Sequence, residues 1–307
     1  MDNKNFEDLK VMSDEEIIAE ISNELGYDYI NKPDDGWECA GSMFEWIERK
    51  FHGNHATINS FTEDGYITKL SFSGLDINHL PFAVAGLTSL RVLDLSHTKV
   101  EVLPEWIDML TNFEILNIYG TSINFLPNSI GNIISLKELH LGSSKITELP
   151  ETIVNLANLE VLHFNHTNIN KLPEEIGKLT ALKSMNLHGS KIEYLPESIG
   201  NLKELEDLYA YYMPLHELPD SIGNLTSLEI LWICQTKVSK LPESIVNLSS
   251  LFDFNYEHTK IKDIPEELCT ILAVNSEKYE SSREDFEDND EDHNIIKMDI
   301  IIPFSYD

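Results

Sequence analysis

Apolar residues recur along this chain with a fixed period of 23 positions. The pair Leu80-Pro81 opens the series, and Leu-Pro returns at residues 103, 126, 149, 172, 195, 218 and 241, followed by Ile264-Pro265. Eight full units therefore span residues 80–263 without an insertion or a deletion. Because a constant period of 20 to 50 residues is the signature of stacked repeats, the sequence predicts a solenoid.

Each unit reads L-P-x-x-I-x-x-L-x-x-L-x-x-L-x-L-x-x-T-x-[IV]-x-x with few departures. In the unit 149–171, Leu159, Leu162 and Phe164 predict a short strand with alternate side chains turned inward. Proline then starts the return segment, because it cannot donate to a strand ladder and its φ is fixed. A partial unit over residues 67–79 supplies one more strand. No unit can bury its apolar side alone, so neighbours must stack.

This pattern resembles the 23-residue leucine-rich repeats of intracellular proteins such as Scribble, Erbin and the Ras-suppressor type. It is also similar to repeats of plant disease-resistance proteins and of bacterial effectors. The resemblance covers residues 67 to about 272. It implies an α/β leucine-rich-repeat solenoid, a curved horseshoe whose parallel concave sheet binds partners. The family shares a binding mode but not a partner, so the resemblance does not identify a ligand.

One position departs from the family pattern. The family usually places Asn after the strand, whereas this chain has Thr98, Thr121, Ser144, Thr167, Ser190, Met213, Thr236 and Thr259. A hydroxyl can make a similar but weaker bond to the backbone. Met213 cannot, and Pro214 follows it, so the unit 195–217 is expected to be locally irregular.

The two ends differ from the repeats and define three regions. Residues 1–64 are expected to form a helical N-terminal cap or small domain, with a capping box at Ser13–Glu16, a helix stop at Gly26 and a second helix near residues 40–51. The solenoid follows over residues 65–274 and closes with a helix from Glu266 to Val274. The last region, 275–307, reads as an acidic linker and a β-prone tail that returns as a cap strand.

Composition narrows the partner and the compartment. With 22 basic and 53 acidic residues, the net charge of −31 disfavours nucleic acid and anionic membrane surfaces and would attract a basic patch on a protein. The three cysteines are far apart, which is typical of a reducing compartment. Neither a signal peptide nor a membrane-length apolar run is visible, so a cytoplasmic location is expected, with non-classical secretion left open.

The candidate binding residues lie at the non-leucine positions that follow the second leucine of each strand. These positions form three columns along the predicted concave face, and exposed Tyr and Trp are frequent in interface hot spots. The predicted partner-binding residues are His140, His163, Asn165, His166, His188, Tyr209, Tyr211, Tyr212 and Trp232. Alternatively, these side chains only stack in ladders that stabilise the sheet, or the histidines make the interface sensitive to pH.

Catalytic and metal chemistry find little support in the sequence. His140 and His163 are neighbours in one column, but no carboxylate or cysteine of the central repeats completes a tetrahedral set, so neither a metal nor a cofactor is expected. No phosphate loop or nucleophile elbow is present, and Cys234 has no predicted oxyanion pocket, so the chain is not expected to be an enzyme. The sequence predicts a protein-interaction module, a scaffold or adaptor. The alternative is a secreted bacterial effector with a small activity in residues 1–64.

Overall fold

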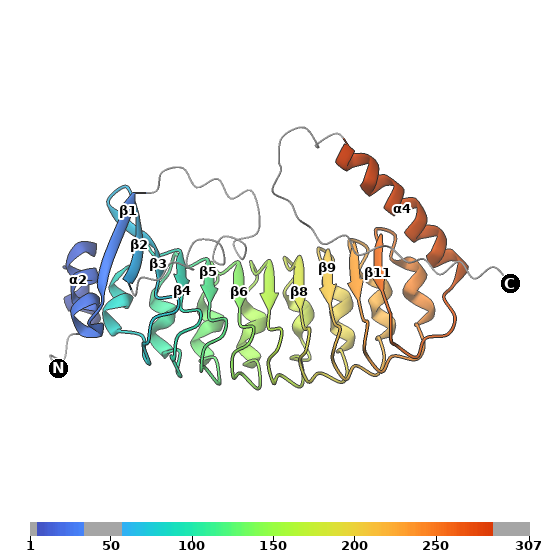
Figure 1. The fold of residues 1–307 in the computed structure, drawn as a ribbon, viewed down its shortest axis with the longest axis horizontal. Coiled ribbons are helices and arrows are strands. Elements are labelled where there is room, and N and C mark those ends of the chain that lie inside the picture. The colour runs from blue at the N-terminus through green and yellow to red at the C-terminus, as the bar shows by residue number, and fades with distance from the viewer. Residues whose placement is uncertain (1–4, 34–56, 285–307) are drawn as a thin grey trace.

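A single sheet runs the length of the molecule (Figure 1). The computed structural model describes residues 5–33 and 57–284, and within them eleven strands follow one another in chain order from β1 to β11. Neighbouring strands are parallel, except that β2 and β3 are antiparallel. The sheet forms one side of a stack of repeats, as the period of 23 residues predicts.

The repeat strands are three residues long and equally spaced. They are β4 (Val92–Asp94), β5 (Ile115–Asn117), β6 (Glu138–His140), β7 (Val161–His163), β8 (Ser184–Asn186), β9 (Asp207–Tyr209), β10 (Ile230–Trp232) and β11 (Asp253–Asn255). Each residue pairs with the residue 23 positions later, as Leu162 does with Met185. Both side chains are fully buried because the middle residue of each strand points into the core.

Short 3-10 helices form the opposite side of the stack. They are η1 (Phe82–Gly86), η2 (Glu105–Met109), η3 (Asn128–Asn132), η4 (Glu151–Asn155), η5 (Ile176–Lys178), η6 (Glu197–Asn201), η7 (Asp220–Asn224) and η8 (Glu243–Asn247). All but η5 begin directly after the proline of the Leu-Pro pair. Proline is well suited to the start of a helix, because the N–H that it lacks would have no partner within the helix there. In η4, Ile153 is fully buried, as is Leu156 just after it, and they hold the helix on the core.

The N-terminal helical cap predicted from the sequence is confirmed over residues 6–25. Helix α1 (Phe6–Leu9) is followed by α2 (Asp14–Leu25), whose capping box joins Ser13 and Glu16 and whose last turn ends at Gly26 with φ of 72°. Ile17 and its neighbours on α2 are buried against η1. A helix is therefore used to cover the end of the repeat core. The second helix predicted near residues 40–51 lies outside the described residues.

Two strands of the N-terminal region were missed by the sequence analysis. Strands β1 (Asp28–Pro33) and β2 (Thr57–Glu63) extend the sheet beyond β3 (Tyr66–Ser71), the strand predicted for the partial unit. The β2–β3 turn is Asp64-Gly65, with φ of 50° and 85°. This dipeptide is a strong hairpin signal, because both turn residues take left-handed conformations.

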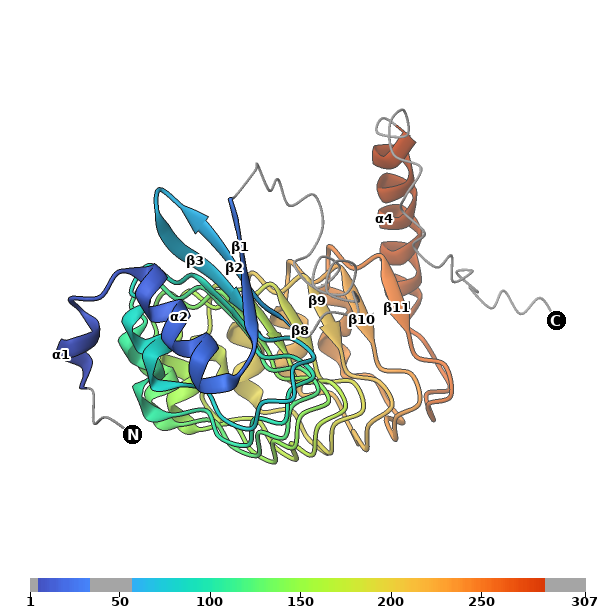
Figure 2. The ribbon, with the colours of Figure 1, turned by 60° about the vertical axis from the view of Figure 1, so that its left-hand side comes forward.

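The C-terminal helix is longer than predicted. Helix α4 (Glu266–Glu284) continues ten residues beyond Val274, so the start of the predicted linker is helical, and it projects away from the repeats (Figure 2). Leu268 is buried against the last repeat, and the ring of Tyr279 stacks on Phe252 at 4.3 Å. The helix thus covers the last repeat through side chains from Leu268 to Tyr279. The acidic segment and the tail predicted as a cap strand lie beyond the described residues.

Four threonines at the position after the strand bond to the backbone as expected, whereas the Ser144 hydroxyl has no hydrogen-bond partner among the described residues and that of Ser190 bonds to Met213 Sδ at 3.9 Å. Thr98, Thr121, Thr167 and Thr236 each donate to the carbonyl three residues earlier at 2.7–2.8 Å. The expected irregularity at Met213 and Pro214 is also present. Elsewhere an N–H at the position of Pro214 donates to the preceding repeat, as Lys191 does to Ile169, whereas here His216 donates to Glu193 instead. Proline has no N–H, so this rung must move.

Candidate partner-binding surface

Five columns of side chains run across the strands on the side of the sheet that faces away from the 3-10 helices, here called the open face. The first column lies where the chain enters each strand and comprises Arg91, Glu114, Lys137, Glu160, Lys183, Glu206, Glu229 and Phe252. The second column comprises Val92, Ile115, Glu138, Val161, Ser184, Asp207, Ile230 and Asp253. The third comprises Asp94, Asn117, His140, His163, Asn186, Tyr209, Trp232 and Asn255.

The remaining two columns follow each strand. The fourth column comprises Ser96, Tyr119, Gly142, Asn165, His188, Tyr211, Cys234 and Glu257. The fifth comprises His97, Gly120, Ser143, His166, Gly189, Tyr212, Gln235 and His258. Only the third to fifth columns were predicted from the sequence as candidate binding positions. The second column was not predicted, although strand alternation places the residues on both sides of a buried leucine on the same face.

Side chains of the third column support the backbone in several repeats. Asp94, Asn117, Asn186 and Asn255 each accept a bond from the N–H two residues further on, at 3.0–3.1 Å. Four repeats instead carry a ring at this position: His140, His163, Tyr209 and Trp232. Each ring replaces a backbone-bonding side chain whose bond contributes about 1 kcal/mol. These four repeats therefore exchange a hydrogen bond to the backbone for ring contacts between strands.

Six of the predicted residues come together as one aromatic cluster over β7 to β10. It consists of His166, His188, Tyr209, Tyr211, Tyr212 and Trp232. His188 stacks on Tyr211 with ring centroids 4.0 Å apart, and Trp232 meets Tyr209 edge-to-face at 5.2 Å. Most of these rings are half-buried, while Tyr212 is 57% exposed. The cluster presents a continuous ring surface to solvent, built from four neighbouring repeats.

His140 and His163 form a separate pair, and here the expected exposure was wrong. Their rings lie 5.3 Å apart, but His140 is only 3% exposed, and Asp94 and Asn117 in the same column are 1% exposed. His140 Nε2 lies 3.1 Å from a Glu138 oxygen, and His163 Nε2 lies 3.1 Å from the Ser184 hydroxyl. The N-terminal members of the third column are therefore buried, and a position in the column does not by itself determine the exposure of its side chain.

Two imidazoles of the open face are held neutral. Burial, followed by the neighbouring His140, lowers the pKa of His163 to about 3. Burial and the neighbouring His166 lower the pKa of His188 to about 4. A histidine switch needs a pKa near neutral pH. These two side chains therefore contribute ring surface rather than a charge that changes between pH 5 and 8.

The fifth column lies at a left-handed corner of the chain. His97, His166, His258, Ser143, Tyr212 and Gln235 have φ between 53° and 58°, a conformation that costs a residue other than glycine about 1 kcal/mol. Gly189 makes room for the ring of His166, since a Cβ there would lie 2.8 Å from His166 Nδ1. Glycine would suit every one of these corners. His166 and Tyr212 place their rings at two of these corners, and both rings belong to the aromatic cluster.

Comparison with known proteins agrees with this architecture. The sequence family described as leucine-rich repeat region matches residues 128–214 and 152–236. Residues 128–236 thus match this family, and the stack of repeats has the fold of solved leucine-rich-repeat proteins. No curated protein gives a significant match to the sequence.

Solved structures share the fold at low sequence identity. A leucine-rich-repeat protein of Leptospira interrogans aligns with a TM-score of 0.62 and 22% identity, covering 86% of this chain and 62% of that protein. The plant peptide hormone receptor RGFR1, solved in complex with RGF2, gives 0.62 and 26%, covering 70% of this chain and 38% of the receptor. The ectodomain of the Arabidopsis thaliana receptor kinase GASSHO1/SCHENGEN3, in complex with CASPARIAN STRIP INTEGRITY FACTOR 2, gives 0.59 and 29%, covering 71% and 26%. This chain thus spans less than two thirds of each.

Carboxylates of the open face lie beside the aromatic cluster. Burial, with Glu206 and Glu229 close by, raises the pKa of Asp207 to about 6. Burial also raises the pKa of Asp253. The nearby indole N–H of Trp232 offsets part of that rise, although its geometry is too poor for a hydrogen bond. The pKa of Glu229 is raised by burial and by Glu206. The open face of β9 to β11 therefore holds several carboxylates that are partly shielded from water.

Replacing Asp207 with asparagine should stabilise the domain near neutral pH. The folded-state pKa lies above the unfolded value of 3.8, so ionisation opposes folding as pH rises through this window. We expect a gain of about 1–2 kcal/mol at pH 7.5, after discounting for solvent screening, that shrinks below pH 6 and vanishes near pH 4. Urea unfolding between those pH values measures it. Glu151→Gln, an exposed change of equal charge, is the control, and a gain that does not depend on pH would contradict the assignment.

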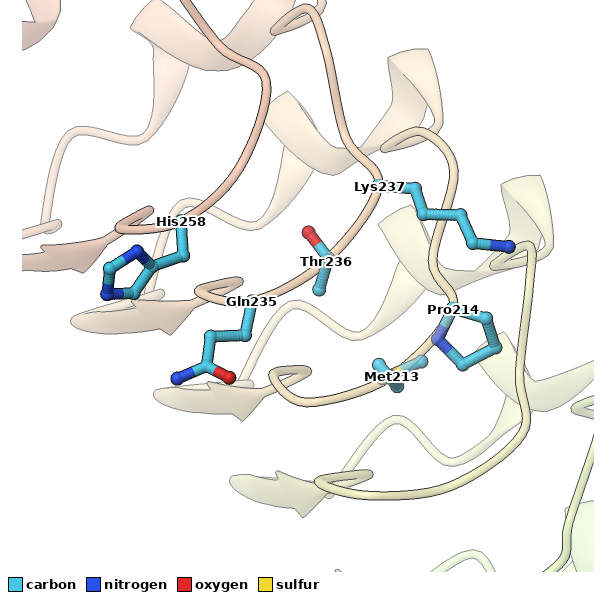
Figure 3. A pocket seen from close by; sticks show the side chains of 6 residues that line it. All are labelled: Met213, Pro214, Gln235, Thr236, Lys237 and His258. Carbon is cyan, nitrogen blue, oxygen red and sulfur yellow. The ribbon is translucent and has the colours of Figure 1, made fainter.

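A shallow depression lies at the edge of the open face, where the repeat is irregular (Figure 3). It has a volume of about 530 Å³ and is lined by Met213, Pro214, Gln235, Thr236, Lys237 and His258. Gln235 and His258 belong to the fifth column, next to Tyr212. Pro214 lacks the N–H that the equivalent residue Lys191 donates to the preceding repeat, so the hydrogen bond to the preceding repeat is made by His216 instead. The depression therefore places polar side chains, among them Gln235 and His258, beside the aromatic cluster.

Residues 5–33 and 57–284 offer neither a cluster of metal ligands nor a membrane-spanning helix. No group of three or more His, Cys, Asp or Glu side chains in these ranges could hold a metal ion. In the same ranges, no helix combines the length and the apolar character that crossing a bilayer requires. Cys234 is half-buried on the face, and burial raises the pKa of its thiol. A thiol with a raised pKa is a poor nucleophile at neutral pH.

Proposed function

We propose that this chain is a protein-interaction module that binds a protein partner on the open face through the aromatic cluster. The observation that carries the proposal is the replacement of backbone-bonding side chains by Tyr209 and Trp232, which join Tyr211 and His188 in one ring surface. Large rigid rings provide contact area at a small cost in conformational entropy, and they dominate interface hot spots.

Two features support this proposal. Two plant receptors that are similar in fold and 26–29% identical have been solved in complex with RGF2 and with CASPARIAN STRIP INTEGRITY FACTOR 2. In addition, the cluster differs from exposed rings elsewhere on the molecule. Tyr66, Phe125 and Tyr194 lie outside the five columns and do not join the cluster. We propose a scaffold or adaptor role in which recognition, and not catalysis, is the function.

The triple variant Tyr209→Ser, Tyr211→Ser and Trp232→Ser is expected to lose the partner. Removing a hot-spot ring commonly costs about 2 kcal/mol, so the loss of three should reduce capture at least about thirtyfold. The immobilised wild type and the variant are incubated with lysate of the source organism, and retained proteins are quantified by mass spectrometry. Circular dichroism confirms that the variant remains folded.

The matched control carries Tyr66→Ser, Phe125→Ser and Tyr194→Ser, which remove three exposed rings elsewhere on the molecule. The control should retain the partner at the wild-type level. If the folded triple variant also retains it, the aromatic cluster is not the binding site and the proposal fails.

A further inference from the structure

Charges alternate along the first column and then stop alternating. Arg91, Glu114, Lys137, Glu160 and Lys183 follow one another with opposite signs, and neighbouring strands are joined by ion pairs. Glu114 bonds to Arg91 at 2.8 Å and to Lys137 at 3.0 Å, while Lys183 bonds to Glu160 at 2.8 Å. The next two members are Glu206 and Glu229, and no cation follows them in the column. The internal pairing of charge therefore ends at β8.

The second column adds two carboxylates at the same place. Ile230 pairs with Asp207 on one side and Asp253 on the other, so the two carboxylates flank one apolar side chain across three strands. Their strands are two spacings apart, about 10 Å. Within residues 57–284, neither Lys nor Arg forms an ion pair with Asp207, Glu229 or Asp253. Burial raises the pKa of all three carboxylates, and the nearby Glu206 raises those of Asp207 and Glu229 further. A bound cation would favour their charged forms.

Aromatic rings border these carboxylates. Tyr209 pairs with Trp232 in the strand register, one position beyond the buried leucines that separate them from Asp207 and Ile230. The rings meet edge-to-face at 5.2 Å, and Tyr211 approaches Trp232 at 5.7 Å. Burial raises the pKa of the Tyr209 hydroxyl, and the nearby Asp207 and Asp253 raise it further. A guanidinium can bond to carboxylates through its edge while its face rests on an indole.

We propose that the open face of β9 to β11 docks an extended basic segment of the partner protein, with an arginine side chain between Asp207 and Asp253 against Trp232. This inference rests on the proposed function and specifies the chemistry of the partner. Charge complementarity selects the occupant, because the surface combines unpaired carboxylates with rings, and the net charge of −31 attracts basic chains. Arginine fits better than lysine, since it can bond two acceptors and stack at once.

The test uses fluorescein-labelled ten-residue peptides in which Gly-Ser pairs separate three arginines, three lysines or three glutamines. Fluorescence anisotropy is recorded at about 0.15 M salt, where long-range charge effects are screened beyond about 8 Å. The wild type should bind the arginine peptide more tightly than the lysine peptide and should not bind the glutamine peptide. The variant Asp207→Asn with Asp253→Asn should weaken arginine binding about tenfold or more, because it removes both close charge partners.

The matched control is Glu151→Gln with Glu174→Gln, which removes two exposed carboxylates on the side of the 3-10 helices. It changes the net charge equally and should alter binding by less than about twofold, since distant charges are screened. Melting curves confirm folding of both variants. The inference is overturned if no peptide binds, if the glutamine peptide binds as tightly, or if the two double variants behave alike.

Capture of the natural partner separates this inference from the proposed function. If the partner is lost from the aromatic triple variant and from Asp207→Asn with Asp253→Asn, both stand. If it is lost from the aromatic variant only, the cluster is the site but the basic segment is wrong. If both variants keep the partner, the proposed function fails, and the basic segment as a feature of that partner fails with it.

Discussion

Replacing Leu162 with aspartate is expected to unfold the central repeats of the solenoid. Leu162 is fully buried in the middle of β7, with Leu139 and Met185 as its partners on the neighbouring strands. A carboxylate there must ionise without solvent or remain protonated, and either outcome costs at least about 4 kcal/mol. Because each repeat is stabilised by its neighbours, the loss should spread to the adjoining repeats. Far-UV circular dichroism and urea unfolding measure it.

The matched control is Leu162→Met. Methionine occupies the equivalent position of the next repeat, Met185, where it is also fully buried. The volume is conserved, so the change should cost less than about 1.5 kcal/mol. If Leu162→Asp instead melts at the wild-type temperature, the strand register derived from the 23-residue period is wrong.

Replacing Gly200 with valine is expected to force apart two neighbouring 3-10 helices, η6 and η7. A Cβ at Gly200 would lie 2.4 Å from the carbonyl oxygen of Ser221, a backbone atom that cannot rotate away. Overpacking against a fixed atom costs about 3 kcal/mol. Urea unfolding should therefore shift to a lower midpoint with the secondary structure retained at low denaturant.

The control for this variant is Asn201→Val, which adds a similar side chain at the adjacent exposed position and should change stability by less than about 0.5 kcal/mol. A midpoint for Gly200→Val equal to that of the control would mean that the helices can separate freely. The same close approach recurs at Gly131, Gly177 and Gly223, where the nearest carbonyl oxygen lies 2.0–2.3 Å from the added Cβ. Val154 occupies the same position before η5, the helix that begins later in its repeat.

The residues that hold the fold together and those proposed to bind a partner lie on opposite sides of one strand. Leu208 and Leu231 are fully buried, while their neighbours Asp207, Tyr209 and Trp232 are only partly buried and face outward. Substitutions of the outward set should therefore change binding while preserving the stack. Asp207 goes further, because its ionisation opposes folding near neutral pH. A surface that lowers stability in the free protein is expected where a partner supplies the missing interaction.

Most of the fold could be predicted because every repeat states the same pattern. An exception to the pattern in one repeat does not obscure it, because the equivalent positions 23 residues away still follow it. The strands and the Leu-Pro segments were therefore located correctly. The N-terminal strands β1 and β2 occur once, outside the period, and β1 pairs with a strand that is distant along the chain. Local propensity alone does not identify such strands, although Asp64-Gly65 marked the turn.

The candidate surface was predicted less completely. Alternation placed His188, Tyr211 and Trp232 on one face, and these rings are in contact. The burial of His140 was missed, since exposure depends on what covers a side chain and not on its position in a strand. The carboxylates Asp207 and Asp253 were missed because only the positions after the buried leucine were considered.

The sequence by itself determined the period, the register of the strands and the alternation that separates the core from the open face. These follow from chain geometry, since side chains alternate along a strand and a constant period forces equivalent residues into columns. Tertiary structure decided which members of those columns remain accessible, which rings touch, and where ion pairing stops. Those properties depend on distances between side chains of different repeats, such as the 2.8 Å that joins Lys183 to Glu160. Such distances are set only when the repeats stack.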